Sequence, residues 1–173
     1  FVYYPLHIEQ ERNLLLAAPF FTNQIELIRN IAKSLPVSHK LLVKEHPAQE
    51  TREWRAISDY KKIMKIPNVI LIHPTVPSQE ILEKCSLVVT IGGTTGLEAA
   101  FYRKPSIILS QMDYSILPSV EFVQDVHELS NKIKESLEKE VKADDLDRFI
   151  QIYEKNSFEF DYMDFVTKYH ESF

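Results

Sequence analysis

Glycine is scarce in this chain of 173 residues, which contains only three. They are Gly92, Gly93 and Gly96, so all of them lie within five positions. Glycine permits a positive φ and lets a ligand approach the backbone closely. Such clustering in an otherwise glycine-poor chain predicts one turn that needs a positive φ or close contact with a ligand. A phosphate-bearing ligand is the best explanation.

Cysteine and long apolar runs are also rare. Cys85 is the only cysteine, which excludes an intrachain disulfide and is typical of a reducing compartment. No apolar stretch reaches the ~18 residues that a membrane-spanning helix needs. We therefore predict a cytoplasmic protein without a membrane span. Any association with the inner membrane would be peripheral and mediated by partner proteins.

Clustered positive charge is missing as well. The formal net charge is −5, from 20 Lys and Arg against 25 Asp and Glu, and no basic run occurs. This balance argues against a broad nucleic-acid surface. Hydrophobic residues make up 45% of the chain, a composition that indicates a globular domain.

The chain begins with Phe1-Val2-Tyr3-Tyr4-Pro5, which already reads as a strand, and it has neither an initiator Met nor a signal peptide. We therefore expect a piece of a two-domain protein. Residues 1–173 are predicted to form a single domain, with a sheet core at 1–125 and closing helices at 126–173.

Short apolar runs alternate with helical patterns through the first two-thirds of the chain. The runs contain few alternating polar residues, as in strands covered on both faces. This pattern predicts an α/β, Rossmann-like open parallel sheet with helices on both faces, closed by the C-terminal helices. The expected strands are 1–4, 40–44, 69–72, 87–91 and 106–109, and the expected helices are 23–35, 53–64, 78–82, 95–102, 126–139, 144–155 and 161–169, with 6–18 as a polar loop.

Three motifs follow strands of this predicted sheet. They are Glu45-His46-Pro47, His73-Pro74 and the turn Gly92-Gly93-Thr94-Thr95-Gly96. Because ligands of doubly wound sheets bind beyond the carboxyl ends of the strands, all three are expected on the ligand-binding rim.

The Gly/Thr turn could hold a phosphate with backbone N–H groups, threonine hydroxyls and the dipole of the following helix. It differs from the GxxxxGK[ST] loop, because no Lys follows, and from GxGxxG in its spacing. A plain strand-to-helix turn is the alternative. Glu98, about one turn into that helix, could accept the hydroxyls of a ribose or simply complement the helix dipole.

The histidines have two readings. His46, followed by Pro47, could donate to a phosphate, or its ring could be hydrogen-bonded within a turn; the second reading applies more strongly to His73. His46, His73 and Glu98 lack the HxxxH or CxxC spacing of a metal site, so no metal is predicted. Tyr114, in the loop after the fifth strand, could stack on a base or pack within the loop.

The segments KLLVKEHP, PNVILIHP and VVTIGGTTGLEAAFYRKPSIIL resemble the C-terminal half of bacterial capsular and surface polysaccharide biosynthesis proteins. The opening YYPLHIEQE is similar to that family too, so that the resemblance covers roughly residues 1–125. These proteins look like glycosyltransferases of the GT-B type, which are built from two Rossmann-like domains. The resemblance implies that this chain is the domain that binds the nucleotide-sugar donor.

The resemblance also implies roles for individual residues. The pair His46-Pro47 resembles a motif that holds the donor phosphate in transferases using CMP-sugars, which makes His46 the catalytic residue that stabilises the departing phosphate. Gly93, Thr94 and Thr95, flanked by Gly92 and Gly96, would hold phosphate, Glu98 the ribose and Tyr114 the base. No cofactor is implied beyond a CMP- or UDP-activated sugar substrate, and the N-terminal acceptor-binding domain would supply the general base.

Two alternatives to a transferase domain stay open. One is half of a UDP-sugar 2-epimerase-like enzyme, which shares the glycine and Glu98 segment and would release UDP without an acceptor. The other is a non-catalytic domain with a degenerate nucleotide site and no measurable affinity. The His-Pro pair is also a feature of CDP-alcohol phosphotransferases.

Overall fold

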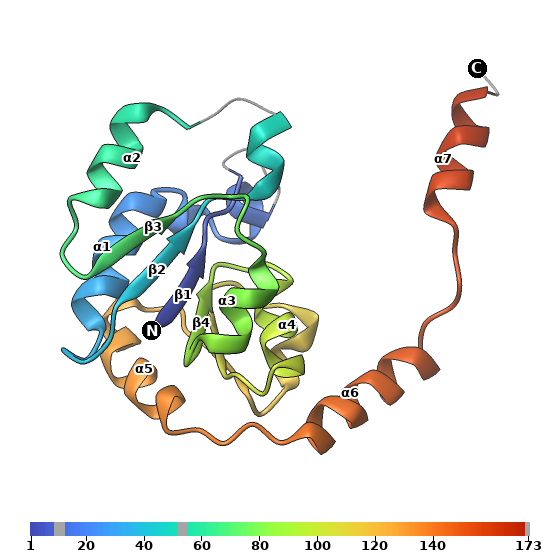
Figure 1. Ribbon diagram of the computed structural model, residues 1–173. Helices are drawn as coiled ribbons and strands as arrows, with labels where there is room; N and C mark the ends of the chain where they lie inside the picture. Colours follow the sequence, from blue (N-terminus) through green and yellow to red (C-terminus); the bar gives the residue numbers. More distant parts are fainter. Residues whose placement is uncertain (9–12, 52–54, 172–173) are drawn as a thin grey trace.

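Six parallel strands form one open sheet in the order β3-β2-β1-β4-β5-β6. The computed structural model, drawn in Figure 1, describes residues 1–8, 13–51 and 55–171. The order runs outward in both directions from the pair β1 and β4, which is the crevice where ligands bind in doubly wound sheets. The strands are β1 Val2–Pro5, β2 Leu41–Lys44, β3 Val69–Ile72, β4 Leu87–Thr90, β5 Ser106–Ile108 and β6 Val120–Phe122.

Successive residues of a strand enter different cores. Val2 and Tyr4 of β1 lie in the largest hydrophobic cluster, whereas Tyr3 between them lies in a cluster on the opposite face. The central strands are buried on both sides, as β4 shows with four buried residues in a row. This explains why the strands appear in the sequence as continuous apolar runs.

Helices cover both faces of the sheet (Figure 1). The largest cluster joins the sheet to α1 (Gln24–Ser34), α2 (Ile57–Met64) and α5 (Leu129–Leu137). The opposite face is packed by α3 (Ser78–Lys84) and α4 (Thr95–Phe101), with α6 (Ala143–Lys155) against α4 and β5. The predicted Rossmann-like α/β fold is therefore confirmed.

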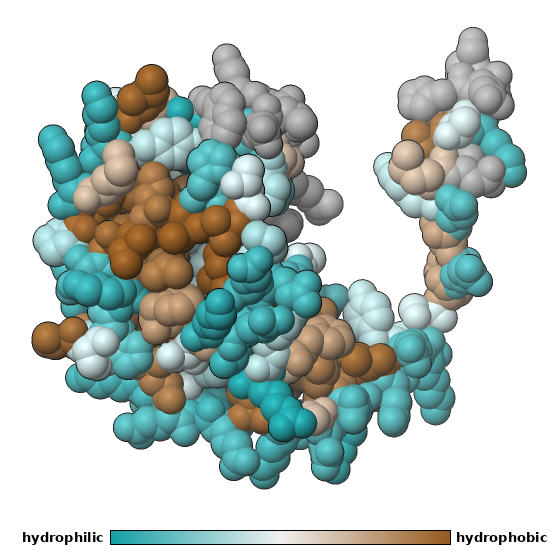
Figure 2. Space-filling model, viewed as in Figure 1, coloured by the Kyte–Doolittle hydropathy of each residue, from teal (hydrophilic) through white to brown (hydrophobic). Residues whose placement is uncertain are grey.

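The C-terminal helices do not all close the domain. Helix α6 packs on the body through Leu146 and Phe149, but α7 (Tyr162–Glu171) stands apart from the sheet in Figure 1. The edge strand β3 is the least covered strand. Figure 2 shows hydrophobic side chains gathered over it, and Ile70 is 46% exposed.

Most predicted elements are present, with informative differences. Strand β6 was not predicted, because its three residues include Glu121 and follow Pro118. Asn23 caps α1, since its Oδ1 accepts from the backbone N–H of Glu26 at 3.2 Å. Ser78 is the first residue of α3, and its hydroxyl accepts from Lys44 Nζ at 2.8 Å.

Two predicted boundaries were wrong. The supposed polar loop at 6–18 contains buried residues on both sides of the undescribed stretch, Leu6 to Ile8 and Leu14, and a single π-helical turn at Asn13–Ala17. The helix expected to begin at 126 starts as a 3₁₀ turn, Val126–Glu128, before α5. Helix α2 begins at Ile57, and the start predicted for it at Glu53 and Trp54 lies outside the described residues.

Candidate functional site

A cavity of about 350 Å³ opens at the carboxyl ends of β1, β2 and β4. It lies at the point where the strand order reverses, the position at which open α/β sheets bind ligands. The cavity brings together two of the three predicted motifs. It is lined by Pro5, Leu6, His7, His46, Thr90, Gly92, Gly93, Thr94, Thr95 and Met112.

His46 is held in one orientation by its own turn. Its Nδ1 accepts the backbone N–H of Ala48 at 3.1 Å, while the short 3₁₀ helix that begins at Pro47 carries the chain away. In a neutral imidazole one ring nitrogen accepts and the other donates, so this bond leaves the N–H on Nε2. His46 therefore presents a ring donor without having to be protonated. Pro47 is exposed and shapes the turn rather than the cavity wall.

His7, from the segment after β1, is a second histidine in the same cavity. Its Nε2 lies 3.0 Å from Thr90 Oγ1, and only 6% of the residue is exposed. Burial, with a smaller contribution from the charge of nearby His46, lowers the pKa of His7 from 6.5 to about 4. His7 is thus a neutral ring at physiological pH. Sequence reasoning missed it, because it lay in a stretch interpreted as a polar loop.

The Gly/Thr turn contacts His7 through Thr90 at the end of β4. Thr90 Oγ1 lies between His7 and the backbone N–H of Gly93, from which it accepts at 3.3 Å. A Cβ on Gly93 would lie 3.1 Å from Cε1 of His7, so any other residue would require the ring to shift by a few tenths of an ångström. The His7 ring therefore packs directly against the backbone of the Gly/Thr turn.

The reason for the glycines differs from the prediction. None of the three has a positive φ, so conformational freedom is not what the turn requires. Each is instead crowded: a Cβ on Gly92 would meet Met112 Sδ at 3.2 Å, and one on Gly96 would meet Tyr114 Oη at 2.7 Å. The cluster is glycine-rich because neighbouring side chains pack against its backbone: those of β5 and its loop at Gly92 and Gly96, and those of His7 and Thr90 at Gly93.

Tyr114 belongs to this packing and has no exposed ring face for a base. It is 2% exposed, and its hydroxyl donates to the Gly93 carbonyl at 2.5 Å. Burial raises the pKa of Tyr114 far above its usual value. The alternative reading, packing within the loop, describes its position, and its hydrogen bond fixes the Gly/Thr turn from below. Gly96, at the end of the turn, is buried within α4 and is not part of the cavity wall.

Thr94 and Thr95 line the cavity, whereas Glu98 lies just beyond it. Thr94 Oγ1 donates to Glu98 Oε1 at 2.7 Å, which ties the carboxylate to the rim of the cavity. Helix α4, which these residues begin, is only seven residues long. Binding by this turn would therefore depend on its hydroxyls and backbone N–H groups more than on a helix dipole.

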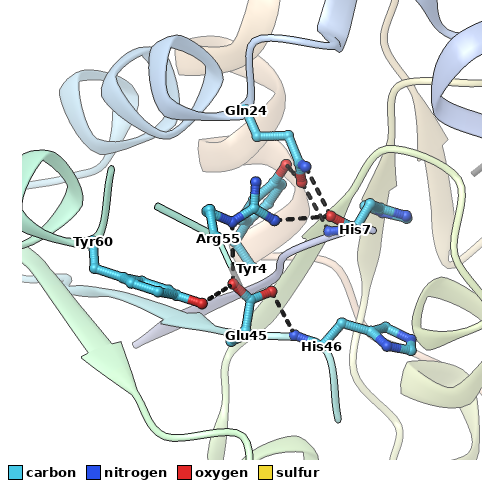
Figure 3. A network of polar contacts seen from close by, with 7 residues as sticks. All are labelled: Tyr4, His7, Gln24, Glu45, His46, Arg55 and Tyr60. Atoms are coloured by element: carbon cyan, nitrogen blue, oxygen red, sulfur yellow. Dashed lines mark hydrogen bonds and ion pairs between the residues drawn. The ribbon is translucent and has the colours of Figure 1, made fainter. Parts of the chain in front are cut away.

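A buried polar network lies behind the two histidines (Figure 3). The Glu45 and Arg55 side chains form an ion pair at 3.1 Å and are 2% and 3% exposed. Glu45 Oε1 accepts the backbone N–H of His46 at 2.8 Å, and Arg55 Nη2 donates to the carbonyl of His7 at 3.0 Å. Gln24 and Tyr60 complete the network. Glu45 directly follows β2, Arg55 precedes α2, Tyr60 lies within α2 and Gln24 begins α1, so no local sequence pattern predicts the network.

The second His-Pro pair does not reach this cavity. His73 is exposed, and its Nδ1 lies 2.8 Å from Thr75 Oγ1. With Pro74 it lines a separate cavity of about 290 Å³, which Glu45 and Tyr60 border from the other side. Among the described residues there is no group of three His, Cys, Asp or Glu that could hold a metal ion. No helix within the described ranges is long and apolar enough to cross a membrane.

Solved structures with the same fold include enzymes that act on nucleotide sugars. The chain superposes on Thermosulfurimonas dismutans KpsC, a beta Kdo 2,7 transferase, with a TM-score of 0.55 and 16% identity over 74% of this chain and 43% of that one. UDP-GlcNAc 2-epimerase from Methanocaldococcus jannaschii gives a TM-score of 0.60 with 16% identity over 90% of this chain and 45% of that one. The same epimerase has been solved with UDP-GlcNAc and UDP and gives 0.53 at 15% identity, with the same coverage.

At such identities these likenesses establish the fold, which is the Rossmann-like fold of GT-B proteins, and the chain spans less than half the length of each of these neighbours. No curated protein sequence matches the chain. Residues 1–150 match the family described as capsule polysaccharide biosynthesis protein, which is well over half of the chain. The chain therefore belongs to the capsule polysaccharide biosynthesis protein family.

Proposed function

We propose that this chain is the nucleotide-sugar donor-binding domain of a glycosyltransferase that builds a surface polysaccharide. One observation carries the proposal: two histidines and the Gly/Thr turn line a single cavity at the switch point of the sheet. Neutral N–H and O–H donors that converge on one cavity suit a phosphate group. Membership of the capsule family supplies the biological setting.

In this proposal His46 donates its Nε2–H to the phosphate that leaves with the nucleotide. Thr94, Thr95 and the backbone of Gly93 bind the same phosphate, for which Thr94 exchanges its bond to Glu98 and the Gly93 N–H its bond to Thr90. Glu98, beside Thr94, then accepts hydroxyls of the ribose. The His46 N–H, already held in place by its turn, stabilises the negative charge that develops on the leaving group. His7 contacts the turn through Thr90 and stays neutral, so it contributes position rather than charge.

The partner in catalysis would be an acceptor-binding domain of the same protein. The chain covers 43–45% of the transferase and the epimerase that it resembles, so a second domain of similar size is the expected complement. That domain would provide the acceptor and the general base across the cleft. A cytoplasmic location is the further expectation, because activated sugars are cytoplasmic substrates.

The donor class is open between CMP- and UDP-activated sugars. None of the described residues that line the cavity is Lys or Arg. A diphosphate carries more charge than a single phosphodiester, and uncompensated charge is costly beside a partly buried wall. The described wall therefore favours a donor with one phosphate.

Calorimetric titration with CMP, CDP, UDP and GDP tests the proposal, and the chain provides its own control. His46→Ala should cost about 1–3 kcal/mol of binding free energy for the preferred nucleotide, the usual range for a hydrogen bond to a charged group. His73→Ala, which changes the other His-Pro pair, should leave affinity unchanged. Absence of binding at millimolar nucleotide to both this chain and the full-length protein would contradict the proposal and favour a degenerate site.

A 2-epimerase-like activity is the second candidate, because a UDP-GlcNAc 2-epimerase with this fold has been solved with UDP-GlcNAc and UDP. It predicts a preference for UDP over CMP and release of UDP from UDP-GlcNAc without any acceptor. Incubating the full-length protein with UDP-GlcNAc alone and measuring UDP separates the two candidates. A transferase of the proposed kind would release nucleotide at an appreciable rate only with an acceptor present.

A further inference from the structure

Glu45 and Arg55 form a buried ion pair behind the cavity wall. Both side chains are almost fully enclosed, and removing two charges from water costs more than their attraction usually returns. Well-packed apolar residues of similar size would stabilise a fold at least as well. The charges at this position therefore call for an explanation other than stability.

Glu45 uses both carboxylate oxygens. Oε1 accepts the backbone N–H of His46, and Oε2 accepts from Arg55 Nε at 3.1 Å and from the Tyr60 hydroxyl at 2.8 Å. The first of these bonds fixes the peptide from which the His46 ring projects. The other two fix the carboxylate itself, and hydrogen bonding to Glu45 adds to burial in raising the pKa of Tyr60.

Arg55 connects this arrangement to the other histidine. Its Nη2 donates to the His7 carbonyl, and the Gln24 carboxamide pairs with the same peptide, accepting from His7 N–H and donating to His7 O, both at 2.8 Å. Figure 3 shows the chain of contacts from Gln24 to the His7 peptide, and from there through Arg55 and Glu45 to the backbone of His46. One ion pair thus joins the peptides that carry both cavity histidines.

We propose that Glu45 and Arg55 are positioning residues, a buried ion pair that sets the two cavity histidines, His46 and His7, at the spacing required to bind a phosphate between them and the Gly/Thr turn. What the histidines bind rests on the function proposed above, whereas the spacing is a property of the free protein. Outer-shell groups of this kind orient ligand-binding histidines and are costly to change. Neither residue touches the ligand.

Arginine rather than lysine is required by this arrangement. The guanidinium donates from Nε to Glu45 and from Nη2 to His7 at the same time, a fork that a single ammonium does not reproduce. Arg55→Lys keeps the charge and should release the His7 peptide. Glu45→Gln keeps an oxygen for the His46 N–H and should weaken the link to Arg55.

The first test uses the free protein and needs no ligand. Imidazole ¹⁵N and ¹³C NMR signals of His46 and His7 should shift in Arg55→Lys and Glu45→Gln, while those of His127, in the 3₁₀ turn before α5, stay in place. Glu121→Gln is the control, because Glu121 is also an ion-paired glutamate, bonded to Lys132 and Lys139, but it lies on β6 away from the cavity. Unchanged signals of His46 and His7 in both variants would overturn the proposal.

The second test separates positioning from stability, with CMP and UDP as probes. The double variant Glu45→Leu/Arg55→Met should recover much of the stability lost in Arg55→Met, since an apolar pair replaces the charges. Its nucleotide affinity should nevertheless remain on the order of tenfold or more below that of the unmodified chain. Full affinity in a stable double variant would contradict positioning. If neither the unmodified chain nor the full-length protein binds either nucleotide, the proposed function fails, and the NMR test still decides this inference.

Discussion

The two His-Pro pairs of this chain follow neighbouring strands, and their surroundings differ sharply. His46-Pro47 follows β2, is preceded by a buried Glu45 and lines a cavity with His7 and the Gly/Thr turn. His73-Pro74 follows the edge strand β3 and is preceded by Ile72, and its ring is bonded to the adjacent Thr75 in an exposed turn. The first pair is linked through Glu45 to Arg55, to Tyr60 and to the His7 peptide. The ring of the second pair bonds within its own turn, beside the cavity that it shares with Glu45 and Tyr60.

This difference shows that the dipeptide alone does not define a site. What distinguishes His46 is the strand that precedes it, since β2 lies beside β1, next to the switch point, whereas β3 lies at the edge. The buried network then adds long-range contacts that a surface turn lacks. Changes at the two pairs and their supports should therefore have very different consequences.

The largest difference should appear in stability. Arg55→Met leaves Glu45 buried without its charge partner, which typically costs about 3–5 kcal/mol of unfolding free energy. Thr75→Val, which removes the support of His73, should change stability by no more than about 0.5 kcal/mol, as exposed substitutions generally do. Urea denaturation of both variants measures this difference. Equal losses of unfolding free energy would show that the two His-Pro pairs do not differ in their structural support.

Acid should lower the free energy of unfolding through His7, which lies in the cavity beside His46. Its folded pKa of about 4 lies below its ordinary 6.5, so between these values the unfolded chain binds more protons than the native one. Stability that is fully present above pH 6.5 is then lost as the pH falls toward 4, by up to about 3 kcal/mol.

His7→Gln removes the titrating group and can keep a hydrogen bond to Thr90. Its unfolding free energy should fall less steeply between pH 6.5 and 4 than that of the unmodified chain. Denaturation at a series of pH values checks this, and parallel curves for the two proteins would show that His7 does not carry the effect.

Gly93→Ala should disturb the cavity from the side of the turn. The added methyl would lie 3.1 Å from His7 Cε1 and 3.3 Å from Thr90 Oγ1, so the ring must move. Overpacking of this kind costs about 1–3 kcal/mol, and nucleotide affinity should fall with it. Combining Gly93→Ala with His7→Ala should restore part of the stability; a strictly additive loss would mean that the two residues do not press on each other.

The smallest effect is expected at Glu98, at the outer rim. Glu98→Gln keeps an acceptor for Thr94 and should change stability by less than about 1 kcal/mol. If Glu98 binds the ribose, the variant should lose most of the preference for a ribonucleotide over its 2′-deoxy form. Calorimetry with CMP and dCMP measures that preference, and an unaltered ratio would remove Glu98 from the site.

The fold could be predicted from the sequence because its signals are local. Val/Ile/Leu runs mark the central strands, and Asn23 and Pro36 delimit the first helix. Strand β6 escaped prediction because only its pairing with β5, and not its composition, makes it a strand.

The candidate site could be predicted only in part. His46 and the glycines follow strands directly, so the rule that ligands bind at carboxyl ends locates them. The same rule applied to β1 would have found His7, but the charged residues after it concealed the signal. The links from Glu45 to Arg55 and from His7 to Gln24 span 10 and 17 positions without a periodic pattern, and the steric origin of the glycines depends on Tyr114 and Met112.

The central claim is that the cavity beside His46, and not the turn at His73, binds a nucleotide phosphate. Titrating the chain with CMP and with UDP while following the imidazole signals of its six histidines by NMR tests it most directly. The account predicts saturable shifts at His46 and His7 with one of the nucleotides and an unchanged His73. Shifts centred on His73, or none at millimolar nucleotide with the full-length protein, would contradict it.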